Sequence, residues 1–203
     1  MKSLRAPFTL LLPLASIAIW VLLVALPVTF IYTRMLRQTD ASGAYHSSFV
    51  NVPRQELFPF ATRLALIKQG EFVESLNRPA DFVSLLIARL SPSWPSMWTP
   101  AHFSPREWNA IASPFYCLPF WWFAGLGIDA LRRHRHPRWP TLLLGTLLCG
   151  CMLFLFLGMT FALSPAEKGG IALWGFLFWS LLLAVFPLAW IKARRNPKAN
   201  TAA

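Results

Sequence analysis

Four long apolar runs dominate the pattern of hydrophobic and polar positions along this chain. They cover Ala6–Tyr32, Ala112–Leu131, Thr141–Leu163 and Ile171–Ile191. Each is about 20 residues or longer, the length that an α-helix needs to cross the ~30 Å hydrocarbon core of a bilayer. None alternates as a barrel strand does, and backbone groups inside lipid must bond within their own segment, so each run predicts a helix. The predicted fold class is an all-α integral membrane protein with a four-helix transmembrane bundle.

The charged residues beside these runs predict the topology. Basic residues precede the first run, separate the second from the third and follow the fourth. Because basic loops are retained in the cytoplasm, we expect both termini to be cytoplasmic and the chain to cross the plasma (inner) membrane several times. Arg34 and Arg37 match Lys2 and Arg5 across the first run, so the later loops decide the orientation. The predicted segments are a cytoplasmic N-terminus at 1–5, transmembrane helices at 6–32, 112–131, 141–163 and 171–191, an external segment at 33–111, a basic cytoplasmic loop at 132–140, a short external loop at 164–170 and a basic cytoplasmic tail at 192–203.

The first run predicts a helix that stays in the mature protein. Its basic start is typical of a signal peptide, but it is much longer than the about 7–15 apolar residues of a signal peptide's central region. Pro13 and Pro27 interrupt the run. They are the predicted bend points, because proline lacks the N–H donor that a helix interior requires.

The external segment at 33–111 is predicted to be mostly helical. Its first apolar stripe at helical spacing is followed by Gly70, which we expect to end the helix. A second stripe covers 82–90. A stretch rich in proline and tryptophan at 90–105 predicts an irregular segment on the outer membrane surface. The members of the first stripe are Leu57, Phe60, Leu64 and Ile67.

A third helix is predicted to begin at Pro105. Ser104 and Glu107 have the spacing of a capping box, and proline is favoured at the first helical position. This helix leads towards the second apolar run. A segment as small as 33–111 cannot bury its own apolar stripes in a core. We therefore expect the external segment to contact another membrane or extracytoplasmic protein, or the membrane surface.

Composition and charge agree with a membrane protein. Hydrophobic residues make up 56% and charged residues 13% of the chain, whereas about a quarter of the residues in a soluble domain are charged. The net charge of +11 is compatible with binding to nucleic acid, but the sequence contains no basic-aromatic nucleic-acid-binding module. We therefore expect membrane lipids as partners and no nucleic acid. No run has a charge near its middle, which disfavours ion-coupled carriers, voltage sensors and pumps.

The sequence predicts no catalytic residue, no cofactor and no metal site. Cys149 and Cys151 lie two residues apart, and on a helix such residues do not face each other. Ordinary packing is therefore the preferred interpretation of this pair. His46 and His102 share the external segment with several carboxylates, but none has the spacing of a metal or catalytic motif. We expect these histidines on the solvated surface.

Small residues in the third run predict close helix packing. Gly145, Cys149, Gly150 and Gly158 lie along that run, and small residues let helix backbones approach each other. Packing within the bundle is preferred to self-association of two copies.

The second run holds the candidates for a functional cleft. Its aromatic rings near mid-depth would line a cleft for a lipid, a quinone or another flat apolar ligand, although plain packing is the simpler interpretation. Asp129 is the only carboxylate inside any run. A functional role would explain it, but so would a salt bridge with Arg132 or Arg133, or contact with water at the interface. The candidates are Tyr116, Trp121, Trp122 and Asp129.

Three functions follow in order of preference. The first is a non-enzymatic accessory or scaffold subunit that uses residues 33–111 to contact its partner. The alternative is a small transporter-like or lipophile-binding membrane protein that uses the mid-depth aromatic residues. A membrane-embedded enzyme comes third. The motifs identify no family, and they name no substrate, partner or oligomeric state.

Overall fold

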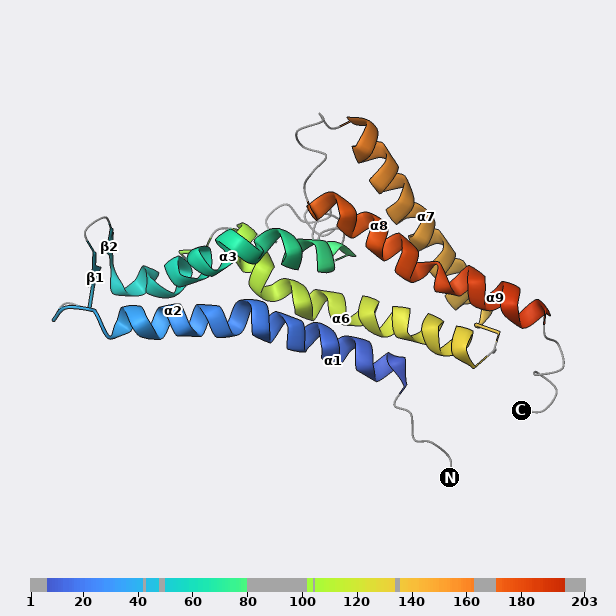
Figure 1. Cartoon of the computed structure of the whole chain (residues 1–203), viewed down its shortest axis with the longest axis horizontal. Coiled ribbons are helices and arrows are strands. Elements are labelled where there is room, and N and C mark those ends of the chain that lie inside the picture. Colours follow the sequence, from blue (N-terminus) through green and yellow to red (C-terminus); the bar gives the residue numbers. More distant parts are fainter. Residues whose placement is uncertain are drawn as a thin grey trace, which may run out of the picture. The chain divides into compact units, whose positions relative to one another are not determined.

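The computed structural model describes residues 7–41, 43–47, 50–79, 102–103, 105–133, 136–162 and 171–195. These residues are mostly helical (Figure 1). The chain divides into two compact units, which are described separately. The terminal unit comprises Met1–Ser16 and Cys117–Ala203, and the central unit comprises Ile17–Tyr116. The elements are α1 (Phe8–Trp20), the π-helix η1 (Val21–Ala25), α2 (Leu26–Leu36), β1 (Tyr45–His46), β2 (Asn51–Val52), the 3₁₀-helix η2 (Arg54–Glu56), α3 (Leu57–Leu76), α6 (Pro105–Arg132), α7 (Trp139–Ala162), α8 (Ile171–Leu183) and α9 (Val185–Arg195).

Three helices among the described residues are long and apolar enough to cross a membrane. They are Phe8–Leu36, Trp139–Ala162 and Leu173–Arg195. Their outward faces carry large apolar side chains, as at Phe154 and Phe161 on α7, which suits hydrocarbon better than water. Three of the four predicted spans lie largely within these helices.

The remaining predicted span, 112–131, lies inside α6, which is not one of these three. Pro114, Pro119 and Asp129 lower the mean hydropathy of this stretch. The helix is continuous across the predicted boundary at 111/112 and begins at Pro105, so the predicted start is confirmed. The count of four spans stays a prediction.

The first candidate span contains a π-helical turn at the predicted bend. The N–H of Leu26 donates to the carbonyl of Val21, five residues earlier, just before Pro27. Pro27 has no N–H for the carbonyl of Leu23, and a π turn accommodates this loss without ending the helix. At Pro13, by contrast, α1 continues without interruption. The helix extends to Leu36, four positions beyond the predicted limit.

The core of the terminal unit is centred on Phe186 of α9. This side chain is fully buried and stacks on Phe123 of α6, with ring centroids 4.6 Å apart and planes at 28°. Gly145 of α7 faces the same ring, and a Cβ added there would clash with it. A Cβ added to Gly127 of α6 would lie 2.5 Å from Val185 and 3.0 Å from the Phe186 ring. One side chain thus joins three helices.

A helix break separates α8 from α9. α8 ends at Leu183, Ala184 forms a turn, and α9 begins at Val185. Pro187 explains the break, because it lacks the N–H that would bond to the carbonyl of Leu183. The ladder resumes when the N–H of Leu188 donates to the Ala184 carbonyl at 3.2 Å.

In the central unit, α3 lies along α2 (Figure 1). Two buried clusters join the helices. Near the start of α3, Leu57 and Ala61 pack with Met35, and farther along Ala65 and Val73 pack with apolar residues of the first candidate span. The contact residues of that span are Val24 and Val28 in the cluster, with Trp20, Leu23 and Ile31 beside them.

The predicted end of α3 is wrong. The helix does not end at Gly70 but continues to Leu76, because Val73 gains a buried position against α2 and η1. The members of the predicted stripe differ in exposure, since Leu57 is buried, Leu64 is exposed and Ile67 is 75% exposed. The small residues Ala61 and Ala65 also belong to the buried clusters.

A short β-hairpin is the described exception to the predicted all-α fold. β1 and β2 pair antiparallel, with Tyr45 opposite Val52 and His46 opposite Asn51. Val52 is buried in the cluster with Met35, so the hairpin closes one end of the α2–α3 pair. The predicted helix at 82–90 and most of the proline- and tryptophan-rich stretch lie outside the described residues.

Candidate functional site

Asp129 binds the beginning of α1. Its Oδ1 accepts the N–H of Phe8 at 3.1 Å, and its Oδ2 accepts the N–H of Thr9 at 3.2 Å. N–H groups in the first turn of a helix have no partner within the helix, and Pro7 before them has no side chain that could cap them. A carboxylate also suits the positive end of the helix dipole. Asp129 therefore acts as a helix cap supplied by another helix.

Gly125 and Arg132 complete this contact. A Cβ on Gly125 would lie 2.6 Å from the carbonyl oxygen of Phe8 and 2.7 Å from the Cα of Thr9. The guanidinium of Arg132 lies 5.8 Å from the centre of the Phe8 ring. Gly125, Asp129 and Arg132 are spaced four and three residues apart, so they share one face of α6. Sequence reasoning missed Gly125, although its spacing to Asp129 was a usable signal.

Trp121 belongs to a closed aromatic cluster in the terminal unit. Its ring centroid lies 4.6 Å from that of Trp179 and 6.1 Å from that of Phe178, and the residue is 7% exposed. Its buried indole N–H has no hydrogen-bond partner among the described residues.

The other two candidates lie in different surroundings. Trp122 is exposed although its neighbour Trp121 is buried, which places the two rings on different faces of α6. Tyr116 belongs to the central unit and is exposed. The four predicted residues are therefore a helix cap, a buried ring and two exposed rings.

The outer surface of α3 carries exposed apolar side chains outside the candidate spans. We define the α3 outer face as Leu64, Ile67 and Phe72, all of them exposed. Helical geometry places the positions of Lys68 and Glu71 among these three. The face is thus apolar with charged positions interspersed.

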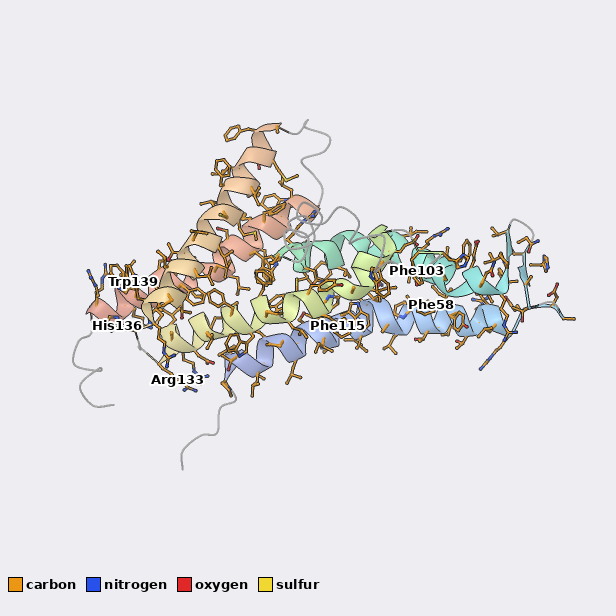
Figure 2. The ribbon with its side chains drawn as sticks, turned by 180° about the vertical axis from the view of Figure 1, so that it is seen from behind. Phe58, Phe103, Phe115, Arg133, His136 and Trp139 are labelled. Carbon is orange, nitrogen blue, oxygen red and sulfur yellow. The ribbon has the colours of Figure 1, made fainter. Side chains whose placement is uncertain are left out.

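An ion pair and a row of aromatic rings fix α3 in the central unit. Arg63 Nε donates to Glu107 Oε1 at 2.5 Å, and Glu107 is buried although Arg63 is half-exposed. Edge-to-face contacts with centroids 5.6 to 6.0 Å apart connect four rings from α2, α3, α6 and the residues before α6 (Figure 2 labels two of them). The helix that carries the α3 outer face is therefore held in place by the ion pair and by the aromatic contacts. The rings are, in order, Tyr32, Phe58, Phe103 and Trp108.

The two external histidines each lie beside one carboxylate. His46 Nε2 is 3.0 Å from Asp40 Oδ2, and Asp40 Oδ1 also accepts the N–H of Ala44 at 3.0 Å, which makes the pair part of a turn. His102 Nδ1 is 4.0 Å from Glu56 Oε1. All four side chains are exposed. Among the described residues, no group of three or more His, Cys, Asp or Glu side chains is placed to hold a metal ion.

Cys149 and Cys151 have different surroundings. Cys149 Sγ donates to the carbonyl of Ser180 at 3.2 Å, and Ser180 Oγ donates to the carbonyl of Cys149 at 3.3 Å. These reciprocal bonds join α7 to α8, whereas Cys151 is exposed. Of the small residues predicted to pack, Gly145 contacts α9, but a Cβ on Gly150 or Gly158 would meet no atom within 4 Å.

Comparisons with protein-family models, curated proteins and solved structures find no match for this chain. Its function is therefore argued from its own residues. Two features stand out from ordinary helix packing: the α3 outer face of the central unit, and the cationic helix ends of the terminal unit.

Proposed function

We propose that the chain is a four-span protein of the plasma (inner) membrane with both termini in the cytoplasm. The contact between Asp129 and the first turn of α1 supports this topology. It brings the beginning of the first predicted span to the end of the second, as a hairpin of two antiparallel spans requires. Basic residues adjoin both of these ends, which favours the cytoplasmic side for each.

Thiol labelling tests this topology. Single cysteines replace Ser47 or His136 in a chain whose three native cysteines are changed to serine; both positions are exposed. A membrane-impermeant maleimide added to intact cells is expected to label position 47 and to label position 136 only after permeabilisation. Labelling of position 136 in intact cells would refute the orientation.

We further propose that the protein is a non-enzymatic accessory or scaffold subunit whose external segment contacts a partner protein. The observation that carries this proposal is the α3 outer face, with Ile67 75% exposed on a helix whose opposite face is packed against α2 and η1. The partner is a protein rather than lipid tails, because Lys68 and Glu71 lie among the apolar positions and charges are costly in hydrocarbon. Charged residues are depleted at the core of a protein interface, but they suit its polar rim.

Site-specific photocrosslinking in cells tests the scaffold proposal. A photoreactive amino acid at Ile67 is expected to give a discrete adduct of higher mass. The matched controls are Ala65, which is buried on the same helix, and Phe154 of α7, which is also 75% exposed but lies on a candidate span. Both controls should give no protein adduct.

The scaffold proposal is judged by comparing the adducts formed by the probes at Ile67 and Phe154. If both positions give only lipid adducts, the α3 outer face is covered by the membrane and the scaffold proposal fails. An Ile67→Ser substitution should weaken the adduct formed from a second probe at Leu64, because both residues belong to the same exposed face.

A further inference from the structure

Six exposed cations lie at helix ends of the terminal unit. One is the last residue of α6 and another follows it directly, one directly precedes α7, and three lie in the last turn of α9. The single carboxylate among the described residues of this unit is Asp129, which accepts the N–H groups of α1. The cations therefore lack a carboxylate of their own within the described part of this unit. They are Arg132, Arg133, Arg138, Lys192, Arg194 and Arg195, and we call them the basic end.

The helices that carry the basic end are packed together. α7 lies against α9, and the Phe186 contacts join α9 to α6. Figure 2 shows Arg133, His136 and Trp139 at the same end of this unit. The cations thus lie at the ends of helices that pack against one another, although they come from separate parts of the sequence.

Aromatic rings orient two of these arginines. The guanidinium of Arg194 lies 4.0 Å from the centre of the Trp190 ring, and that of Arg132 lies over Phe8. A guanidinium stacked on a ring keeps the N–H donors in its own plane available, and that planar set matches two oxygens of a phosphate. The contact with Trp190 is therefore compatible with binding of an oxyanion by Arg194.

Trp139 indicates where this surface lies. It is the first residue of α7, a candidate span, and is 69% exposed. An exposed indole at the end of a span is typical of the headgroup level of a bilayer. The oxyanions available at that level are lipid phosphates.

We propose that the basic end binds the headgroups of anionic phospholipids. Arg194, held by Trp190, binds phosphate oxygens in the plane of its guanidinium, and the neighbouring cations supply the charge that selects anionic over zwitterionic lipids. Nucleic acid is the competing polyanion, and it fits less well because Trp139 and the adjoining span direct this surface at a bilayer. The proposal does not depend on the scaffold function, which concerns the central unit.

Lipid enrichment in nanodiscs tests the proposal. The full-length protein is reconstituted with mixtures of phosphatidylcholine and phosphatidylglycerol, and the lipids retained are counted by native mass spectrometry. Wild type is expected to retain phosphatidylglycerol above its share of the mixture and to lose this preference at high salt. Removal of any one residue of the basic end should lower the enrichment about five-fold.

Variants locate the binding surface. Arg133→Gln, Arg138→Gln and Arg194→Gln together should remove the enrichment, while Arg194→Lys, which keeps the charge but not the planar donors, should lose part of it. The matched control is Arg34→Gln with Arg37→Gln, exposed arginines of the central unit, and it should retain the enrichment. If the triple variant does not fold, Arg194→Gln alone and the salt series provide the same comparison.

Three results would overturn the proposal. The first is a wild type that retains both lipids in the proportion supplied. The second is an equal loss in the Arg34 and Arg37 control, which would mean that overall charge rather than this surface selects the lipid. The third is duplex DNA that displaces phosphatidylglycerol from the protein at physiological salt, which would identify nucleic acid as the preferred polyanion.

Discussion

A Gly125→Val protein is expected to unfold at a clearly lower temperature than wild type, with the first turn of α1 released from α6. The added Cβ would lie 2.6 Å from the Phe8 carbonyl oxygen and 2.7 Å from the Thr9 Cα. These are backbone atoms, so no rotamer change relieves the clash. Overpacking of this kind costs about 1–3 kcal/mol, and loss of the Asp129 cap adds about 1 kcal/mol. Thermal unfolding in detergent, followed by tryptophan fluorescence, measures the change.

Two further variants isolate the cause. Gly158→Val introduces the same side chain into a helix where a Cβ meets no atom within 4 Å, so its stability should stay within about 0.5 kcal/mol of wild type. Asp129→Ala leaves the backbones in contact but removes both acceptors, and it should cost about 1–2 kcal/mol. If Gly125→Val were as stable as Gly158→Val, α1 would not pack against α6 as described.

The second large effect is expected for Gly145→Val, which should separate α7 from α9. The valine side chain would clash with the ring and the Cβ of Phe186. The Phe186 ring cannot move away easily, because it stacks on Phe123. The expected loss is about 2–3 kcal/mol. Gly150→Val, five residues along the same helix and facing open space, is the matched control and should unfold like wild type. The measurement is again thermal unfolding in detergent.

A double-mutant cycle checks that Phe186 is the cause. Phe186→Ala creates a cavity and should cost about 3–5 kcal/mol by itself. When it is combined with Gly145→Val, the methyl groups of the introduced valine fill part of that cavity, so the two separate losses should sum to more than the measured loss. Additive losses would show that Gly145→Val destabilises the protein through a contact other than Phe186.

The apolar runs predicted helices well because hydrocarbon thickness and backbone hydrogen bonding leave few alternatives. The partner of Asp129 was harder to predict. Arg132 and Arg133 lie close in sequence and suggested an ion pair, yet the carboxylate binds backbone N–H groups of Phe8 and Thr9, about 120 positions away. A local pattern indicates that a charge needs a partner, but only the packing of α1 against α6 decides which partner it has.

The apolar stripe of α3 did not show which of its members are buried. Leu57 is buried, whereas Leu64 and Ile67 are exposed, and the small residues Ala61 and Ala65 lie in the contact with the first candidate span. The spacing of Ala61 and Ala65 was the available signal. The hairpin had no comparable signal, since its strands are two residues long and too short for an alternating pattern.

The position of Phe186 has a consequence for how the protein is made. A chain emerges from the ribosome N-terminus first, so in the proposed topology α6 and α7 enter the membrane before α9. Until Phe186 follows, the surfaces over Gly127 and Gly145 stay uncovered. In the proposed topology, the nascent terminal unit therefore completes its packing only with its last helix.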